Sequence, residues 1–420
     1  MRKTLGIFGI ALLAGLLAGC DGDDVAEPAF EAGPLGAVEV GAGEAIQIRT
    51  LLSHTGAPTF GAPLRYGIEL AVRDTGDIHG RQVDLGQPLD GMCSGAGGRA
   101  GALQITADPR QIVGVIGTSC SGVAVEASPV LSGAGLVMIS PSNTSPDLTS
   151  DLEGNASVDY YPGYFRTSNN ALFEAQAVAD FAYGALGLER MVTVDDGDAY
   201  TMGLATAFAN AFRDLGGAVP VAARIDKGQT DMAAVLDEFA EAEPDGIFFP
   251  LFFDEGNPFA EQARAHADLG DATLITDSGL LTPAFLATPQ SLGVYFAGPV
   301  SIDEANVNEV TGRSTAEVLA AYRNAYEEPR TPFWVHAYDA ATLLLSAIES
   351  VGQEVGGTLY VDRAALRDAI METQGFEGLL GTLSCDGFGD CGTGGVSIFH
   401  HTDPEITDPG ELIPVGSGTP

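Results

Sequence analysis

Residues 112–139 read IVGVIGTSCSGVAVEASPVLSGAGLVMI, and this stretch decides the fold class. Residues 112–117 and 136–139 are short apolar runs, which are typical of strands buried on both faces. Residues 124–131 lie between them and predict a helix. A strand, a helix and a second strand of this kind form one unit of a parallel sheet that helices cover on both sides.

The same alternation continues along the rest of the chain. It restarts after a turn-rich stretch at residues 143–163, so we expect two doubly wound lobes with a break near residues 160–170. A chain of 420 residues is also longer than one hydrophobic core usually serves. The other expected helices are at residues 62–73, 97–106, 172–186, 203–215, 232–241, 258–269, 314–326, 335–351 and 362–372, and the other expected strands are at residues 45–52, 82–85, 191–194, 219–224, 246–252, 273–276, 381–384 and 396–400.

The predicted domain organisation has the last hundred residues crossing back between the lobes. Ligands of open α/β sheets bind beyond the carboxyl ends of the strands, so a cleft is expected where the lobes face each other. Residues 21–44 are rich in small, acidic and proline residues and predict a flexible tether, while residues 402–420 predict a loose tail. The expected lobes are an N-terminal one of residues 45–167 with about 300–376, and a C-terminal one of residues 168–299 with about 377–401.

The first 20 residues have the features of an export signal. Arg2 and Lys3 precede an apolar run at residues 5–17, which is shorter than the roughly 20 residues that span a bilayer as a helix. The sequence LAGC at residues 17–20 then resembles the lipobox of bacterial lipoproteins. The resemblance implies a lipoprotein signal at residues 1–20 and an exported protein, in the periplasm or at the cell surface, that is anchored to a membrane through acylated Cys20. The alternative is an ordinary signal peptide with an incidental cysteine.

The cysteine content agrees with export. The chain has five cysteines, and setting Cys20 aside for lipid leaves four, which an oxidising compartment pairs. Four cysteines allow three connectivities, and the spacing favours Cys93 with Cys120 and Cys385 with Cys391. No cysteine pair has the spacing of zinc ligands, so we expect disulfides and no metal site.

The charge of the chain excludes some partners. The 57 acidic and 19 basic residues give a formal net charge of −38 at pH 7. Nucleic acid is excluded as a partner because phosphate binding needs clustered Lys and Arg. Adsorption on anionic lipid is disfavoured as well, so membrane contact is expected through the lipid anchor only.

Several short motifs occur in a fixed order. Through them the sequence resembles the type I periplasmic binding proteins, specifically the leucine/isoleucine/valine-binding branch that serves ABC transporters. The resemblance covers most of residues 45–401 and implies an α/β fold of two doubly wound lobes, with mostly parallel sheets and a hinge of crossing strands. The motifs are GTSCS at residues 117–121, SPSNTSP at 140–146, YFRT at 164–167, DD at 195–196 with Tyr200 and Gly203, YDA at 338–340 and GTL at 381–383.

Three hydroxyl residues within these motifs are candidates for binding a carboxylate. Ser121 is expected at the start of a helix that follows a buried strand, where free N–H groups and the helix dipole attract an anion. Ser142 and Thr144 follow the next strand of the predicted sheet. In the family these three positions hold the α-carboxylate of an amino acid. The alternative for Ser121 is that it only caps its helix.

The resemblance also implies aromatic walls in the cleft. Phe60 follows the first strand, where the family has an aromatic residue over the ligand. Tyr200 and Phe252 occupy matching positions in the second lobe, and Trp334 is close to a further aromatic position of the family. Aromatic walls give apolar contact to a ligand when the lobes close, whereas a single aromatic residue is more often part of the core.

The chain departs from the family where the ligand's ammonium group is bound. The family uses two acidic residues of the second lobe, and this chain has Ala171 at one matching position and Ser278 at the other. A cation in a closed cleft needs a partner. Either Asp277 serves with its loop shifted by one residue, or the ligand lacks an ammonium group. The predicted ligand-binding set is Phe60, Ser121, Ser142, Thr144, Tyr200, Phe252, Asp277 and Ser278.

These features predict a solute-binding lipoprotein. It would capture a small carboxylate-bearing, amino-acid-like ligand between the lobes, as a monomer without a cofactor, and deliver it to an ABC transporter permease. One alternative is a ligand-sensing receptor of the same fold that does not serve transport. A hydrolase is the other, but the chain has no GxSxG nucleophile elbow and no HExxH motif, so we expect no enzymatic activity.

Overall fold

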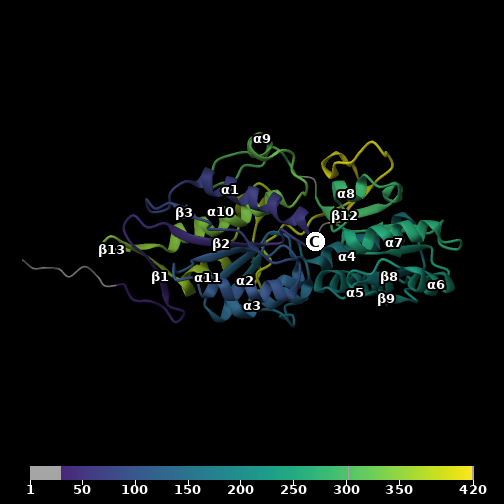
Figure 1. Ribbon diagram of the computed structural model, residues 1–420, viewed down its shortest axis with the longest axis horizontal. Helices are drawn as coiled ribbons and strands as arrows, with labels where there is room; N and C mark the ends of the chain where they lie inside the picture. Colours follow the sequence, from purple (N-terminus) through teal and green to yellow (C-terminus); the bar gives the residue numbers. More distant parts are fainter. Residues whose placement is uncertain (1–29, 301, 419–420) are drawn as a thin grey trace, which may run out of the picture.

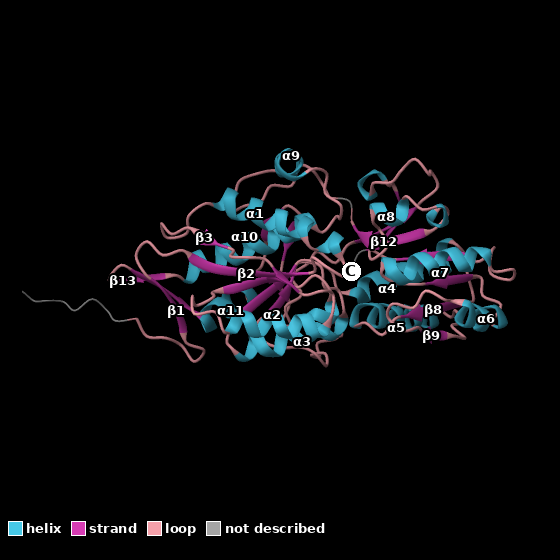
Figure 2. Ribbon diagram, viewed as in Figure 1, coloured by secondary structure: helices cyan, strands magenta, loops and turns pink. Residues whose placement is uncertain are grey.

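The structure of the chain is a computed structural model that describes residues 30–300 and 302–418. Two lobes lie side by side along the long axis of the molecule (Figure 1). In each lobe helices flank a central sheet (Figure 2), which confirms the predicted α/β architecture with mostly parallel strands. The predicted signal at residues 1–20 and the lipidation site Cys20 lie outside the described residues.

The N-terminal lobe contains a fully parallel sheet in the order β3-β2-β5-β6-β7, with β4 also paired to β2. The strands of this lobe are β2 (Ile46–Leu52), β3 (Val83–Asp84), β4 (Leu89–Asp90), β5 (Gly114–Gly117), β6 (Val137–Ser140) and β7 (Tyr164–Arg166), and its helices are α1 (Ala62–Thr75), α2 (Gly95–Thr106), α3 (Ser121–Gly133), α9 (Thr315–Tyr326), α10 (Trp334–Val351) and α11 (Arg363–Met371).

Both faces of this sheet are apolar because both are covered by helices. On β5, Val115 contributes to the core beneath α2 and α3, whereas its neighbour Ile116 contributes to the core beneath α1 and α10. Helices α1 and α10 approach closely at Gly67, where a Cβ atom would lie 2.3 Å from the carbonyl oxygen of Trp334. The absence of a side chain at Gly67 therefore sets the spacing of this helix pair.

The C-terminal lobe contains a sheet in the order β18-β17-β12-β11-β10-β8-β9, in which only β17 and β18 are antiparallel to their neighbours. One core lies beneath α4 and α5 and the other beneath α6, α7 and α8. The strands are β8 (Met191–Asp195), β9 (Ala222–Arg224), β10 (Gly246–Phe248), β11 (Thr273–Thr276), β12 (Tyr295–Pro299), β17 (Val396–His400) and β18 (Pro414–Gly418), and the helices are α4 (Ala171–Asp180), the π-helix η3 (Phe181–Ala185), α5 (Ala199–Asp214), α6 (Ala233–Glu241), α7 (Phe253–Ala265) and α8 (Pro283–Leu286).

The described chain passes between the lobes at three places: after β7, between β12 and α9, and before β17. Two small sheets complete the fold, one in the order β1-β14-β13 and one a hairpin of β15 and β16. The remaining elements are β1 (Ala37–Val40), β13 (Gln353–Val355), β14 (Thr358–Asp362), β15 (Phe376–Gly378), β16 (Gly381–Leu383) and the 3-10 helices η1 (Pro58–Phe60), η2 (Pro146–Leu148), η4 (Pro289–Ser291) and η5 (Pro409–Glu411).

The predicted tether and tail are wrong in part. Residues 37–40 lie within the expected tether of residues 21–44, but they form β1, which pairs with β14 and buries Val38 and Val40. Residues 414–418 lie within the expected loose tail of residues 402–420, but they form β18 at the edge of the C-terminal sheet. Each segment is ordered by pairing with a distant strand, which local composition does not reveal.

One predicted lobe boundary is also wrong. Residues 377–391 were expected in the C-terminal lobe, yet Leu379, Leu383 and Cys391 are buried in the core of the N-terminal lobe. The buried carboxylate of Asp339 on α10 holds this segment by accepting hydrogen bonds from the backbone N–H groups of Leu379 and Leu380, at 2.9 and 2.8 Å. The chain therefore enters the C-terminal lobe after Cys391.

Both favoured disulfides are present, which confirms the predicted pairing. Cys93–Cys120 joins the segment before α2 to the start of α3, and Cys385–Cys391 closes a short loop after β16.

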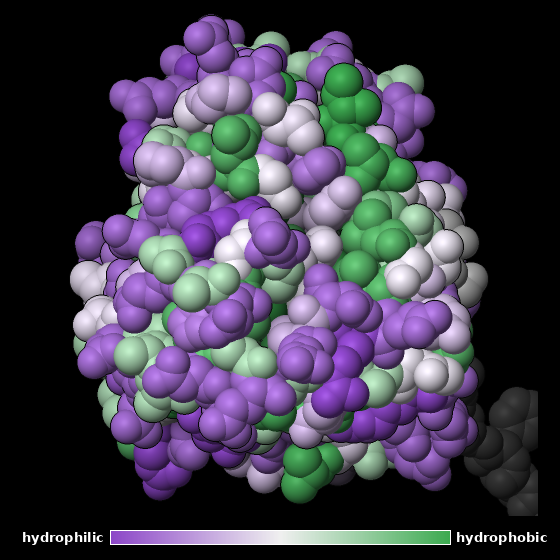
Figure 3. All heavy atoms as spheres, turned by 90° about the vertical axis from the view of Figure 1, so that its right-hand side faces the viewer, coloured by the Kyte–Doolittle hydropathy of each residue, from purple (hydrophilic) through white to green (hydrophobic). Residues whose placement is uncertain are grey.

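In residues 30–300 and 302–418, no helix is both long and apolar enough to cross a membrane. The end of the molecule formed by the C-terminal lobe presents mostly hydrophilic side chains with smaller apolar areas (Figure 3).

Candidate functional site

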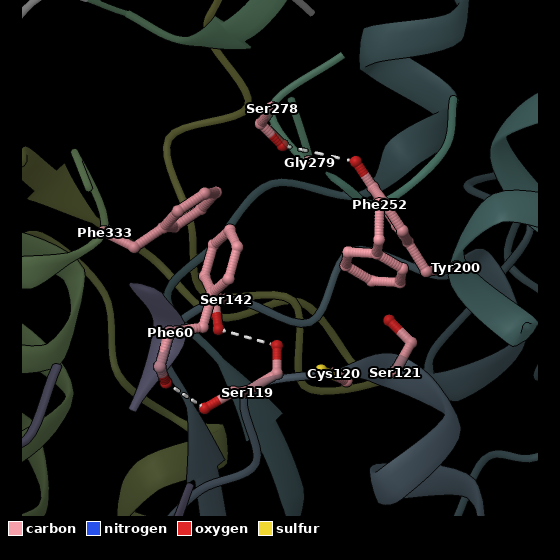
Figure 4. A pocket seen from close by; sticks show the side chains of 10 residues that line it. All are labelled: Phe60, Ser119, Cys120, Ser121, Ser142, Tyr200, Phe252, Ser278, Gly279 and Phe333. Atoms are coloured by element: carbon pink, nitrogen blue, oxygen red, sulfur yellow. Dashed lines mark hydrogen bonds between the residues drawn. The ribbon is translucent and has the colours of Figure 1, made fainter. Parts of the chain in front are cut away.

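A cavity with about 290 Å³ of empty space lies where the lobes meet. No charged side chain lines it. The lining residues, drawn in Figure 4, are Phe60, Ser119, Cys120, Ser121, Ser142 and Phe333 from the N-terminal lobe and Tyr200, Phe252, Ser278 and Gly279 from the C-terminal lobe.

The structure brings six of the eight predicted ligand-binding residues together at this cavity, namely Phe60, Ser121, Ser142, Tyr200, Phe252 and Ser278. It does not place Thr144 or Asp277 in the lining. Thr144 is 1% exposed, and its Oγ1 atom is buried without a hydrogen-bond partner in the described structure. Asp277 is fully buried behind Tyr200 and Ser278.

The floor of the cavity is the start of α3. The N-cap residue of this helix is Cys120, which makes no side-chain cap, so Ser121 is the first helical residue and does not cap the helix. The Ser121 Oγ atom accepts a hydrogen bond from the backbone N–H of Ser145 at 3.3 Å. Its own proton is therefore free to be donated. The backbone N–H groups of the first helical turn have no partner within the helix and favour an anion there.

A chain of hydrogen bonds fixes the neighbouring serines. Ser142 Oγ donates to the carbonyl oxygen of Ser119 at 2.9 Å. Ser119 Oγ accepts from the backbone N–H of Ser53 at 3.1 Å and donates to the carbonyl oxygen of Phe60. These contacts hold the ends of β2, β5 and β6 and the backbone of Phe60 in one arrangement (Figure 4).

The loop that follows Ser142 is held from behind by a buried arginine. Arg166, at the end of β7, is completely buried and pairs with Asp390. Its guanidinium also donates to the carbonyl oxygens of Asn143 and Ser145, at 3.3 and 2.7 Å. Arg166 thus positions the backbone that carries Ser142 and Thr144 next to the point where the chain first leaves the N-terminal lobe.

Two pairs of aromatic rings form the walls. Phe60 and Phe333 lie on the N-terminal side with ring centroids 5.8 Å apart, and Tyr200 and Phe252 lie on the C-terminal side at 5.3 Å. Trp334, the position suggested by the resemblance, instead packs on Tyr322. Phe333, one residue earlier, lines the cavity in its place.

Behind the C-terminal wall lies a group of buried polar side chains. The hydroxyl of Tyr200 donates to Asp277, whose carboxylate also accepts from the backbone N–H of Gly279 at 3.0 Å. Burial raises the pKa of Asp277 to about 7. Burial and the carboxyl group of Asp277 raise the pKa of Glu174 to about 8. Burial therefore favours the protonated form of both carboxyl groups.

Sequence reasoning missed Glu174 as well as Ser119, Cys120, Phe333 and Gly279. Glu174 lies three residues after Ala171 on α4, which is one helical turn along the same face. An acidic residue one helical turn from Ala171 was therefore visible in the sequence. Ser119 and Cys120 stand inside the GTSCS motif, between a strand and a helix, where residues reach the edge of the sheet.

A polar contact joins the lobes beside the cavity. Asp198, the N-cap residue of α5, lies against Gly122 of α3, where a Cβ atom would be 2.8 Å from its Oδ2 atom. Lys227 lies 3.1 Å from the same carboxylate oxygen and donates to the carbonyl oxygen of Cys93 at 3.2 Å. The C-terminal lobe therefore contacts the N-terminal lobe through both a carboxylate and an ammonium group.

Within the described ranges, no group of three or more His, Cys, Asp or Glu side chains is arranged to hold a metal ion. The arrangement offers hydroxyl donors, a helix N-terminus and aromatic walls. Groups of these kinds are suited to binding and enclosing a small molecule.

The periplasmic binding protein family matches residues 46–390 of this sequence. The chain belongs to the periplasmic binding protein family. This membership confirms the resemblance to the type I, branched-chain amino acid branch. Because the matched family consists of binding proteins, the chain is a binding protein and not an enzyme, and it acts outside the cytoplasm.

Individual relatives agree with this assignment. The Leu/Ile/Val-binding protein homolog 3 of Brucella melitensis biotype 1 is 27% identical over 359 residues, which are 83% of this chain and 88% of that protein. The crystal structure of a leucine-binding protein from Thermotoga maritima has a TM-score of 0.73 at 23% identity, covering 90% of this chain and 99% of that one. An ABC-transporter solute-binding protein from R. palustris in complex with benzoate has a TM-score of 0.69 at 21% identity, covering 90% and 97%.

Proposed function

We propose that the protein captures a small carboxylate-bearing, amino-acid-like solute in the interlobe cavity and delivers it to the permease of an ABC transporter. Acylated Cys20 would hold the mature protein at a membrane. The observation that carries the proposal is the position of Ser121 at the cavity floor, on the first turn of α3, with its hydroxyl proton uncommitted.

The electrostatics of the cavity support an anionic headgroup. The first turn of α3 carries partial positive charge, and the cavity lining contains no carboxylate that would repel an anion. Thr144 adds a buried hydroxyl without a partner in the described structure. The net charge of −38 opposes an anion only weakly, because salt screens exposed charges beyond about 8 Å at physiological ionic strength.

The ligands named for the relatives share one group. Branched-chain amino acids are named for the Brucella protein, leucine for the Thermotoga protein and benzoate for the R. palustris protein. All of these molecules carry a carboxylate next to an apolar body. Hydroxyl donors at one end of the cavity and aromatic walls around it suit that combination.

Ligand screening tests the proposal. Thermal-shift measurements with the mature protein would cover amino acids, 2-oxo acids and aromatic acids, because a ligand that binds only the folded state raises its melting temperature. Each hit would then be titrated by calorimetry against wild type, Ser121→Ala and Ser128→Ala. Ser128 lies on the same helix, is buried and is not in the cavity lining, so it is a matched control.

We expect Ser121→Ala to weaken binding about tenfold or more, because a hydrogen bond to a charged group contributes about 1.5–3 kcal/mol. Ser128→Ala should bind as wild type does. Full affinity of Ser121→Ala for every hit would show that the assigned site is wrong. The anchor is tested separately by mass spectrometry of the N-terminal peptide of the mature protein, which should begin at Cys20 and carry acyl chains, whereas a mature N-terminus with an unmodified Cys20 would refute lipid attachment.

A further inference from the structure

We propose that the solute has an apolar body longer than the side chain of a branched-chain amino acid, and that this body lies in a second cavity between the lobes, the outer cavity. This inference rests on the proposed function, because it takes the carboxylate to lie at Ser121 and names what extends from it. It concerns the length and the chemical class of the solute.

The outer cavity adjoins the cavity at the start of α3, which is the inner cavity. Phe60, Phe252 and Gly279 line both cavities, so these three residues form the boundary between them. The rings of Phe60 and Phe252 stand on opposite sides of the inner cavity (Figure 4). The outer cavity contains about 1030 Å³ of empty space, against about 290 Å³ for the inner one. A solute body too long for the inner cavity therefore has the outer cavity as its continuation.

Large apolar side chains from both lobes are exposed in the outer cavity. Met92, from the N-terminal lobe, is 49% exposed, and Phe253, the first residue of α7 in the C-terminal lobe, is 37% exposed. Apolar surface in contact with water is unfavourable, and a ligand that covers it recovers free energy in proportion to the area covered. Exposed apolar surface inside a cavity is therefore a feature of a ligand-binding groove.

The backbone holds Met92 in this exposed position. Met92 has a φ of +52° and Cys93 a φ of +46°, which is the left-handed region that residues other than glycine seldom adopt. The carboxylate of Asp90 accepts a hydrogen bond from the backbone N–H of Met92 at 2.8 Å. Gly56 packs so closely that a Cβ atom there would lie 2.5 Å from the carbonyl oxygen of Met92. Conformations of this kind cluster at ligand-binding segments, where the surroundings enforce them.

The charged side chains of the outer cavity are engaged by the protein or by solvent. The ammonium group of Lys227 donates to the carbonyl oxygen of Cys93 and pairs with a carboxylate of its own lobe. Glu255 is buried, and its Oε1 atom accepts from the backbone N–H of Gly228 at 2.6 Å. Asp254 is exposed to solvent. The outer cavity therefore suits a hydrocarbon or aromatic body rather than a second charged group.

Calorimetry with two homologous series tests the inference. The probes are straight-chain 2-amino acids and straight-chain carboxylic acids of four to ten carbons, each titrated into the mature protein. Each methylene that leaves water for the outer cavity should raise the affinity by up to about fourfold. We expect the affinity to keep rising beyond six carbons, the length of leucine.

Two outcomes of this titration count against the inference. An affinity that is level or falls beyond six carbons in both series would overturn it, while binding of the shorter members would leave the proposed function standing. If no member of either series binds, the proposed function fails and the inference fails with it.

A variant that fills the outer cavity assigns the gain to that place. Ala284, the second residue of α8, is exposed and lines the outer cavity but not the inner one. Ala284→Trp should weaken binding of the longest ligand about tenfold or more, as expected for two or more excluded methylenes, and leave the shortest ligand unaffected. Ala234→Trp adds the same side chain at the exposed second residue of α6 and should match wild type. An equal effect of Ala284→Trp on short and long ligands would contradict the inference.

Met92→Ser provides a second test that does not depend on adding a large side chain. It should weaken binding of the longest ligand about fivefold, because about half of the Met92 side chain is available for the ligand to cover. Leu103→Ser is the matched control, since Leu103 lies on α2 of the same lobe, is 50% exposed and is in the lining of neither cavity. Equal affinity of Met92→Ser and wild type for the longest ligand would overturn the inference even if Ala284→Trp does not fold.

Discussion

Lys227 provides a sharp test of lobe closure, because it is the only lysine in residues 30–300 and 302–418 and its ammonium group contacts both lobes. We predict that Lys227→Met weakens ligand binding without changing the cavity. The side chain does not line the cavity; it lies over the outer side of Phe252, with its Nζ atom 5.6 Å from the ring centroid. Its loss should therefore act on the closed state of the protein rather than on the ligand.

The size of the effect follows from which contact crosses between the lobes. The pair of Lys227 with Asp198 lies within the C-terminal lobe and persists when the lobes separate. Only the hydrogen bond to the carbonyl oxygen of Cys93 is lost on opening. A hydrogen bond from a charged group contributes about 1.5–3 kcal/mol when buried. Lys227 is 46% exposed, so solvent screening reduces this to about 1 kcal/mol, or about fivefold in affinity.

Arg224→Met is the matched control for this prediction. Arg224 pairs with Asp195 at 2.6 Å, and both residues belong to the C-terminal lobe. Each variant removes one positive charge from the same part of the surface, so both change the long-range attraction of an anionic ligand equally. Calorimetric titration should show about fivefold weaker binding for Lys227→Met and near-wild-type binding for Arg224→Met.

Two results would refute the reasoning. Binding by Lys227→Met within twofold of wild type would mean that the contact with Cys93 does not stabilise the closed state. An equal loss in Arg224→Met would mean that charge, rather than the contact between the lobes, causes the effect. Unfolding in denaturant should show similar stability for both variants, because exposed ion pairs contribute about 0–1 kcal/mol.

Three further predictions concern stability. Arg166→Met should lower the free energy of unfolding, measured by urea titration, by about 3–5 kcal/mol, because the carboxylate of Asp390 loses its buried partner. A loss below about 1 kcal/mol would show that the ion pair does not stabilise the fold. Replacing Cys93 and Cys120 together by Ala should cost about 3–4 kcal/mol on the chain-entropy estimate for a separation of 27 residues, as measured by the same titration, and equal stability of the variant would contradict it. Burial lowers the pKa of His336 to about 4, so as the pH falls the unfolded state takes up a proton before the folded state does. The free energy of unfolding should therefore fall by up to about 3 kcal/mol between pH 7 and pH 4. His336→Asn should lack this contribution, and identical pH profiles of the two proteins would refute the prediction.

Much of the fold could be predicted because its strands are buried on both faces. Residues 112–117 are apolar or glycine throughout, residues 273–276 contain only Thr, Leu and Ile, and the structure places strands β5 and β11 within these ranges. The run at residues 246–252 was predicted as one strand, but β10 ends at Phe248. Its last apolar residues leave the sheet because Leu251 belongs to the core and Phe252 to the cavity wall.

Elements that depend on distant partners could not be predicted. Strand β1 has only four residues, and it pairs with β14 in a register that joins Ala37 to Asp362. Its local pattern buries only two valines, Val38 and Val40, within a Gly- and Glu-rich segment. Pairing across more than 300 residues is a property of the tertiary structure, which composition in a short window does not contain.

The candidate site was predictable where it follows strand ends and not where it depends on helix orientation. Ser121 and Ser142 come soon after β5 and β6, whose carboxyl ends meet at one edge of the sheet. Glu174 reaches the same region from α4, and Phe333 does so from the residue before α10. Which turn of a helix faces a cavity depends on how that helix packs, so these two were missed.

The disulfide between Cys93 and Cys120 lies at the centre of the binding region. Cys120 forms part of the cavity floor, and Cys93 supplies the carbonyl oxygen that Lys227 contacts from the opposite lobe. Cytoplasmic reductants keep such thiols unpaired. A chain that is still in the cytoplasm therefore lacks this crosslink, and we expect oxidation after export to fix the floor of the cavity in place.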